Sequence, residues 1–312
     1  MMKNDDTNKK QVVFFKFVFL LLTLSMTLAG ITLFKLLSDE SLKISEHIQR
    51  LFFSFSLQIA VILLSAEAWL ASLNLKNSPK YSIETLTISG LYNACKYVPG
   101  KIWGLIIRAA LIKSYTKDKI EVKSTFVDQL AMLHSGFFLL LFSFFYNNKI
   151  VVLGPLCIGF IFSVFYAERI VKSTHYFVNK VTSEAYAEKL IRFIPNDVHN
   201  YSAVVSRFII IWLTLAFSFG LCLTIVLPEL QSSYILILKI TVMAYFAGFV
   251  AFFLPSGIGA REGTIFVLLA PYGTNAEIIS VAILHRVVAT VADIVLALPA
   301  VPLLSKLINT KQ

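Results

Sequence analysis

Residues 209–227 read IIIWLTLAFSFGLCLTIVL, a run of 19 residues without a charged side chain. As an α-helix this run would rise about 28 Å, close to the ~30 Å thickness of the hydrocarbon core of a bilayer. Comparable apolar runs occupy residues 17–37, 51–73 and 278–304. We therefore predict an all-α polytopic membrane protein.

The composition of the whole chain supports this class. Of its 312 residues, 57% are hydrophobic and 15% are charged, whereas soluble domains carry about 25% charged residues. So few polar side chains could not cover the surface of a soluble protein. No polar segment is long enough for a soluble catalytic domain, so we expect neither an enzyme nor a cofactor. The net charge of +10 is spread over short connections, which argues against a nucleic-acid partner.

Basic residues collect in alternate connections between the apolar runs. They gather in the N-terminal tail (1–16), in connections at 76–80, 113–123 and 172–192, and in the C-terminal tail (305–312). The connections at 38–46, 147–149, 228–233 and 271–275 hold only Lys43 and Lys149. The positive-inside rule then places both termini and the loop at about 170–206 in the cytoplasm. A single transmembrane domain is expected over residues 17–304.

The first apolar run could be mistaken for a secretory signal, because lysines precede it. It is longer than the ~7–15 residues of a signal's apolar region, and Asp39 and Glu40 follow it where a cleavage site would be expected. We interpret residues 17–37 as an uncleaved first transmembrane helix.

A helix break is predicted at Pro99 and Gly100. The apolar stretch 83–112 lies between two basic connections that both belong in the cytoplasm, so one crossing would put one of them outside. Proline removes a backbone donor and glycine permits a sharp turn. We therefore predict a re-entrant hairpin over residues 83–112 that enters and leaves on the cytoplasmic side.

A second break is predicted between Leu254 and Gly263. If residues 234–270 dip into the membrane from outside and return, the last helix ends in the cytoplasm beside the basic C-terminal tail. The alternative is a full crossing by residues 234–254, which would leave the C-terminus outside. With full crossings at 17–37, 51–73, 126–146, 149–169, 207–227 and 278–304, the first version gives about six full helices and two opposed re-entrant hairpins. This layout is typical of inverted repeats. The alternative is that the Pro and Gly shared by the two breaks are a chance similarity.

Basic side chains follow both breaks. Lys101 would lie in the first turn of a helix, where the helix dipole is already positive, and Arg108 lies on nearly the same face. Free N–H groups and a cation together suit a phosphate or carboxylate. Arg261 stands in the corresponding place after the second break, next to Glu262, which could cap the helix or pair with Arg261. The alternative is that these cations pair with acids and fix the hairpins.

Other charged residues lie inside the predicted spans, where each costs at least ~2.5–3.5 kcal/mol on insertion scales. They are Glu67, Lys96, Asp128, Lys239, Arg286 and Asp293. Arg286 and Asp293 are two turns apart on one helix face, so each could meet a hairpin. Asp128 and His134 have no spacing that favours a metal site, and we predict no metal ligands or catalytic residues.

The two breaks and the last helix carry a resemblance to a known family. Residues 93–108 (NACKYVPGKIWGLIIR), residues 253–263 (FLPSGIGAREG) and the pair His285-Arg286 resemble the transmembrane domain of lysylphosphatidylglycerol synthase/flippase proteins. The likeness covers nearly the whole chain. By this resemblance the first motif is Pro99, Gly100, Lys101 and Arg108, the second is Pro255, Gly257, Gly259, Arg261 and Glu262, and Arg286 follows. We add Lys96 and Asp293 as candidate substrate-binding residues from their position.

The resemblance implies a bacterial or archaeal inner-membrane protein that helps to move a lipid with a charged head group across the bilayer. The cargo would be a phospholipid or a polyprenyl-phosphate-linked sugar. The soluble aminoacyl-transferase domain of full-length synthases is absent, so aminoacylation is not expected. Asp128 stands where the family often has glutamate.

Two other functions remain open. One is a non-transporting membrane subunit that partners a glycosyltransferase in cell-envelope polysaccharide synthesis. The other is a membrane-embedded transferase, which is disfavoured because there is no D-x-D signature and no cluster of His, Cys and carboxylate residues.

Overall fold

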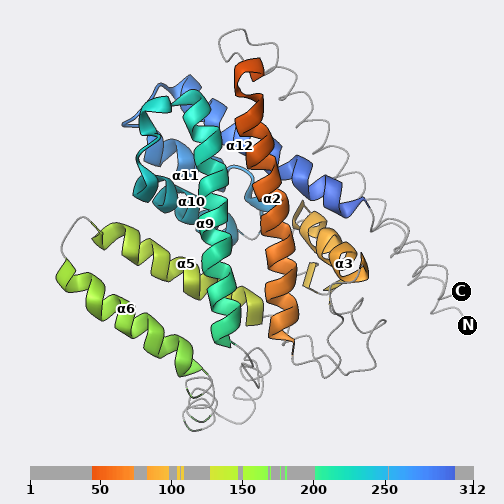
Figure 1. Ribbon diagram of the computed structural model, residues 1–312, viewed down its shortest axis with the longest axis vertical. Helices are drawn as coiled ribbons and strands as arrows, with labels where there is room; N and C mark the ends of the chain where they lie inside the picture. Colours follow the sequence, from red (N-terminus) through yellow and green to blue (C-terminus); the bar gives the residue numbers. More distant parts are fainter. Residues whose placement is uncertain are drawn as a thin grey trace, which may run out of the picture.

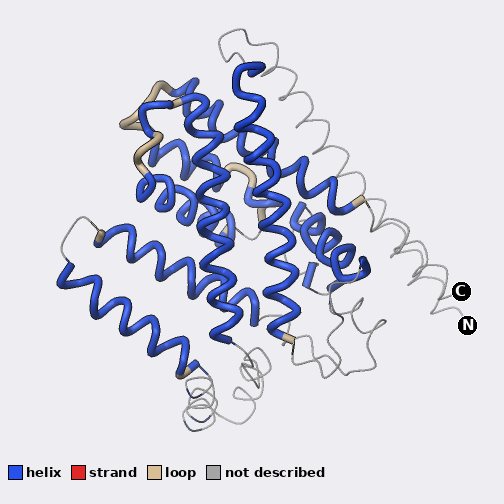
Figure 2. Tube along the Cα trace, in the orientation of Figure 1, coloured by secondary structure: helices blue, strands red, loops and turns tan. Residues whose placement is uncertain are grey.

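The structure of the protein is a computed structural model, and every regular element among the residues that it describes is a helix (Figures 1 and 2). It describes residues 44–73, 83–97, 104–105, 107–108, 127–146, 150–167, 201–251 and 253–298, together with residues 169, 176 and 180. The predicted first helix at 17–37, the turn at Pro99, Gly100 and Lys101, most of the loop at 170–206 and both tails lie outside these residues.

The helices follow one another along the described parts of the chain. Their bounds are α2 (Ile44–Ser72), α3 (Ile83–Ala94), η2 (Cys95–Tyr97), α5 (Val127–Phe145), α6 (Ile150–Phe165), α9 (Tyr201–Val226), η4 (Pro228–Leu230), α10 (Tyr234–Val250), η5 (Pro255–Gly257), α11 (Ala260–Leu269) and α12 (Asn275–Ala297). The elements named η are single 3-10 turns.

Four helices of the described part, α2, α5, α9 and α12, are long and apolar enough to cross a membrane. They confirm that the chain is an all-α polytopic membrane protein and coincide with four of the predicted spans. The predicted span at 149–169 corresponds to α6, whose 16 residues rise only about 24 Å. The number of crossings therefore stays a prediction.

Helix α9 lies at the centre of the fold and contacts α2, α5, α10 and α12 (Figure 1). Its sequence is apolar on every side, as expected of a helix that packs on other helices with one face and is open to lipid with another. Trp212 and Phe219 are almost fully buried. A Cβ atom on Gly136 of α5 would lie 2.8 Å from the Trp212 ring, so the glycine gives the indole its space.

A buried polar cluster joins α2, α9 and α12. Ser54 Oγ donates to the Ser218 carbonyl oxygen at 3.0 Å, and the two hydroxyls are 2.9 Å apart. Gln58 Nε2 lies 3.0 Å from both Ser218 Oγ and His285 Nε2. Each hydrogen bond links helices that are distant in the sequence. Such contacts satisfy polar groups in apolar surroundings and specify which helices pair.

Large apolar side chains cover the outside of the bundle. Examples on four helices are Phe52, Ile158, Phe165, Phe217 and Val267, all more than half exposed. In water so many exposed aromatic and branched side chains would promote aggregation. On a membrane protein they are the surface that the lipid chains contact.

Gly90 brings α3 against α12. A Cβ atom on Gly90 would lie 2.0 Å from the Leu296 carbonyl oxygen, which is backbone and cannot turn aside. We expect Gly90→Ala to lower the free energy of unfolding by about 1–3 kcal/mol, because the two helices must separate. Thermal unfolding of the purified protein in detergent measures this change.

Gly159→Ala is the matched control, because a Cβ atom on this glycine of α6 meets nothing within 4 Å. Alanine also favours the helix more than glycine does. Equal stabilities of the two variants would show that α3 does not pack on α12 as described.

Candidate functional site at the two helix breaks

The described residues just before the first predicted break lie next to the second break. The turn η2 follows α3 and precedes the predicted break at Pro99 and Gly100, the turn η5 lies in the second break, and these two turns contact one another. Helix α12 packs against both α3 and α11 (Figure 1). Segments about 160 residues apart in the sequence (residues 95–97 and 255–257) therefore form one site.

The second break is a tight reversal of the chain. Ser256, Gly257 and Gly259 have φ angles of 52°, 67° and 85°, in the region that L side chains rarely adopt. Pro255 begins the turn, and the chain reverses so that α11 packs beside α10. The predicted break is therefore present. Helix α11 has 10 residues, and its rise of about 15 Å is half of what a bilayer crossing needs.

Glu262 joins the second break to α12. Its Oε2 atom accepts a hydrogen bond from the Gly259 N–H at 2.7 Å, which caps the start of α11. Its Oε1 atom accepts from Arg286 Nη1 of α12. Of the two roles that the sequence left open for Glu262, the cap is present. Its cationic partner is Arg286 rather than the adjacent Arg261.

Asp293 joins the turn η2, just before the first predicted break, to the same helix. Its carboxylate is only 3% exposed and lies 2.6 Å from Lys96 Nζ. Tyr97 Oη donates to Asp293 Oδ2 at 2.8 Å and lies 3.1 Å from the Thr290 hydroxyl. Arg286 and Asp293 thus each meet one break, as their spacing of two helical turns predicts. Helix α12 connects both breaks through charged hydrogen bonds.

Arg108 is fully enclosed by neighbouring side chains. Its side chain is 0% exposed, and Nη1 donates to Asp128 Oδ2 at 2.8 Å. The guanidinium lies between the rings of Trp69 and Tyr92, at 4.2 and 3.9 Å from their centroids. Such stacking suits the flat, weakly hydrated guanidinium. The sequence left two roles open for Arg108, binding of an anionic ligand and pairing with an acid. In this conformation Arg108 pairs with an acid.

Arg261 differs from the other cations at the breaks. Its guanidinium lies over the Tyr245 ring at 3.9 Å from the centroid. Its Nε atom is buried without a hydrogen-bond partner, as are Nε and Nη2 of Arg108, so the difference lies in the ion pairs. The stem packs on Gly248, where a Cβ atom would lie 2.7 Å from Arg261 Cγ. Among the described residues Lys96, Arg108 and Arg286 each form an ion pair with a carboxylate, and Arg261 forms none.

The family of the chain can now be stated. A sequence profile described as the lysylphosphatidylglycerol synthase TM region matches residues 47–297, which is most of the chain. The chain belongs to this family. No curated protein and no solved structure matches the sequence. Family membership and the apolar helices together make it a multi-pass membrane protein with a role in lipid-related processes.

The match places both breaks and α12 of this lysylphosphatidylglycerol synthase TM-region protein inside the family's common region. Pro99, Gly100 and Lys101 of the first motif lie outside the residues that the structure describes. Pro255, Gly257, Gly259, Arg261 and Glu262 of the second motif all lie in the reversal. Their proximity agrees with the resemblance, and their binding of a ligand remains to be tested.

Several partners at the site were not predicted from the sequence. They are the aromatic side chains Trp69, Tyr92, Tyr97 and Tyr245, which hold the cations or donate to Asp293. Only Tyr97 has a sequence signal, because it directly precedes the first break. Outside the site, Glu67 pairs with Arg207 at 3.3 Å. His134 lies within hydrogen-bonding distance of Tyr201 and Ser163. The described residues contain no group of His, Cys and carboxylate residues able to hold a metal ion.

Proposed function

We propose that the protein is a flippase-like transporter, which moves a lipid with an anionic or otherwise charged head group across the inner membrane. The cargo class is a phospholipid or a polyprenyl-phosphate-linked sugar. The observation that carries the proposal is Arg261, a partly buried cation without an acidic partner among the described residues. It directly follows the second break, whose turn η5 contacts η2.

Arg261 lacks an anionic hydrogen-bond acceptor, and the phosphate of a lipid head group could supply one. A charge in apolar surroundings costs several kcal/mol when it is not neutralised. The aromatic face of Tyr245 offsets part of this cost, but the buried Nε–H still has no acceptor. Glu262 is engaged with Arg286 and the helix cap. A head-group phosphate could accept from Arg261 in two parallel hydrogen bonds.

The two ion pairs on α12 suggest how a head group could move the breaks. Lys96, Arg286 and Glu262 are partly exposed in their pairs. An arriving phosphate can therefore compete with Asp293 for Lys96 and with Glu262 for Arg286. Each exchange would release one break from α12, and alternating release would open the site to one side at a time. Lys101 remains the predicted docking residue on the cytoplasmic side.

A proteoliposome assay tests the proposal. Fluorescent phosphatidylglycerol is placed in the membrane, and its passage between leaflets is followed by quenching from outside. We expect Arg261→Ala to slow passage about tenfold, because one charge-assisted contact is lost. Arg261→Lys should keep part of the rate, since it keeps the charge but not the paired donors.

Arg169→Ala is the matched control, because this exposed arginine contacts only the ring of Tyr166 among the described residues. Passage at the wild-type rate in both Arg261→Ala and Lys101→Ala would refute the proposed path. Absence of passage in the wild type, together with a stoichiometric glycosyltransferase that co-purifies, would favour the non-transporting subunit instead.

A further inference from the structure

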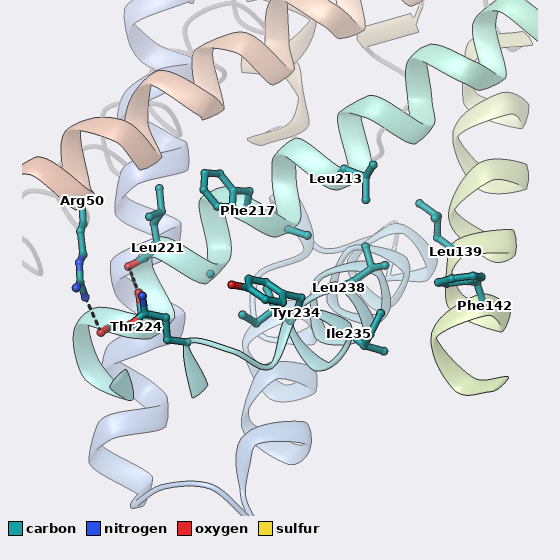
Figure 3. A pocket seen from close by; sticks show the side chains of 14 residues that line it. Arg50, Leu139, Phe142, Leu213, Phe217, Leu221, Thr224, Tyr234, Ile235 and Leu238 are labelled. Atoms are coloured by element: carbon teal, nitrogen blue, oxygen red, sulfur yellow. Dashed lines mark hydrogen bonds between the residues drawn. The ribbon is translucent and has the colours of Figure 1, made fainter. Parts of the chain in front are cut away.

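A second site lies away from the helix breaks, in a groove of about 480 Å³ between α9, α10 and the ends of α2 and α5 (Figure 3). Its walls are apolar and include Leu139, Phe142, Leu213, Phe217 and Leu238. Leu213 and Phe217 are 50% and 59% exposed, so the groove opens to the surroundings of the bundle. None of the residues at the two breaks lines it.

One end of the groove is polar. Arg50 and Thr224 lie at this end, and Leu139 and Phe142 lie at the opposite end (Figure 3). Arg50 Nη1 donates to the Thr224 carbonyl oxygen at 3.1 Å. This contact accounts for one of the five N–H donors of a guanidinium. Among the described residues no carboxylate forms an ion pair with Arg50.

The helix-capping role of Arg50 does not explain the groove. An arginine beside the last turn of a helix interacts favourably with the carbonyl end of that helix, and Arg50 does so with α9. Capping of α9 by Arg50 does not require an apolar groove beside it. The remaining donors of Arg50 lie at the polar end of the groove. Gln231 and Tyr234 also line the groove, and they lie at the start of α10 and in the loop before it.

The length and direction of the groove match one lipid chain. Along α9 the lining runs from Leu213 to Thr224, a rise of about 16 Å, and half of a hydrocarbon core is ~15 Å. Arg50 lies near the beginning of α2 and Thr224 near the end of α9, so the polar end is at the ends of two candidate spans. The apolar end reaches toward the middle of these helices.

We propose that this groove binds one anionic phospholipid. One acyl chain lies along Leu213 and Phe217 of α9 and against Leu238 of α10, and the phosphate accepts hydrogen bonds from Arg50. The apolar walls select a chain. The guanidinium of Arg50, which forms no ion pair with the described residues, selects a negative head group. This site is independent of translocation and would exist in a protein that transports nothing.

Lipid binding to the full-length protein in mild detergent can be measured by native mass spectrometry. The probes are phosphatidylglycerol, phosphatidylcholine with the same acyl chains, and glycerol 3-phosphate. We expect phosphatidylglycerol to bind most tightly and glycerol 3-phosphate not to bind. Arg50→Gln keeps an amide donor but removes the charge, and should weaken phosphatidylglycerol binding about tenfold. Arg50→Lys and the exposed control Arg169→Gln should keep most of it.

A second variant tests the apolar wall. Ala216→Phe places a ring in the groove and should weaken binding of both phospholipids. Leu213→Trp makes the same test at a half-exposed position, should the buried substitution prevent folding. Wild-type affinity for phosphatidylglycerol in folded Arg50→Gln, equal binding of the two phospholipids, or binding of glycerol 3-phosphate would overturn the proposal. A dimer that disappears when the groove is filled would also overturn it, because a second chain would then be the occupant. Passage rates in liposomes are a separate measurement, so failure of translocation leaves this test intact.

Discussion

Replacement of Asp128 by alanine should destabilise the folded protein by about 3–5 kcal/mol, because it leaves the enclosed Arg108 without its counter-charge. Arg108 is 0% exposed and lies between two aromatic rings, so water cannot reach it to replace the carboxylate. The change is measured as the shift of the thermal or denaturant unfolding transition of the purified protein in detergent.

The pair formed by Glu67 and Arg207 provides the matched control. It also joins two helices, but its side chains are 32% and 30% exposed. Glu67 and Arg207 lie within six residues of the end of α2 and the start of α9, where water or lipid head groups can replace a lost partner. Glu67→Ala should therefore destabilise the protein much less than Asp128→Ala does. The double variant Arg108→Met/Asp128→Leu should recover much of the loss, because it removes both buried charges and keeps the volume.

A small effect of Asp128→Ala would have a functional meaning. If the variant is no less stable than Glu67→Ala, Arg108 does not depend on Asp128. Its guanidinium would then be free to bind an anion, which is the first interpretation of the motif at residues 93–108. The stability of one variant thus distinguishes the two roles of Arg108.

The long helices were predictable because the bilayer imposes their length and composition. The run at residues 209–227 identifies α9 without any knowledge of its neighbours, and α12 follows in the same way. Helix α6 was predicted at full length, but its regular part ends at Phe165. Helix α2 begins at Ile44, several residues before the predicted span. Apolar runs define the middle of a helix well and its ends poorly.

The site was only partly predictable from the sequence. Helical spacing correctly placed Arg286 and Asp293 beside the two breaks, since positions seven apart share a face. Spacing cannot reveal partners on other helices, such as Tyr245 beneath Arg261. Arg50 was missed because it directly precedes the predicted span at 51–73. A cation at the end of an apolar helix usually reaches into the interface and has no special role, and only the groove beside it distinguishes it.

The charged residues fall into two groups by exposure. Arg108 and Asp128 are enclosed, and their pairing stabilises the contact between the first broken segment and α5. Lys96, Arg286 and Glu262 are partly exposed, so water or a ligand can compete for them. The enclosed pair is therefore the better candidate for a role in stability. The partly exposed pairs on α12 are the better candidates for contacts that break and re-form during transport.

Gly257→Ala should lower the free energy of unfolding by about 2–5 kcal/mol. The residue has a φ angle of 67°, and a Cβ atom there would lie 2.7 Å from Gly248 Cα. The positive φ angle costs about 1–2 kcal/mol for alanine, and overpacking against backbone adds about 1–3 kcal/mol. Unfolding of the purified protein in detergent measures the sum.

Gly263→Ala is the control in the same hairpin, because its Cβ atom would meet nothing within 4 Å and its backbone is helical. The contact between Gly248 and Gly257 also positions Arg261, whose stem packs on Gly248. Gly257→Ala should therefore slow lipid passage as well as destabilise the fold, whereas Gly263→Ala should do neither. If Gly257→Ala slows lipid passage but unfolds like the wild type, the reversal positions Arg261 and does not hold α10 and α11 together. If stability falls and passage is unchanged, the second break is structural and the path of the head group lies elsewhere.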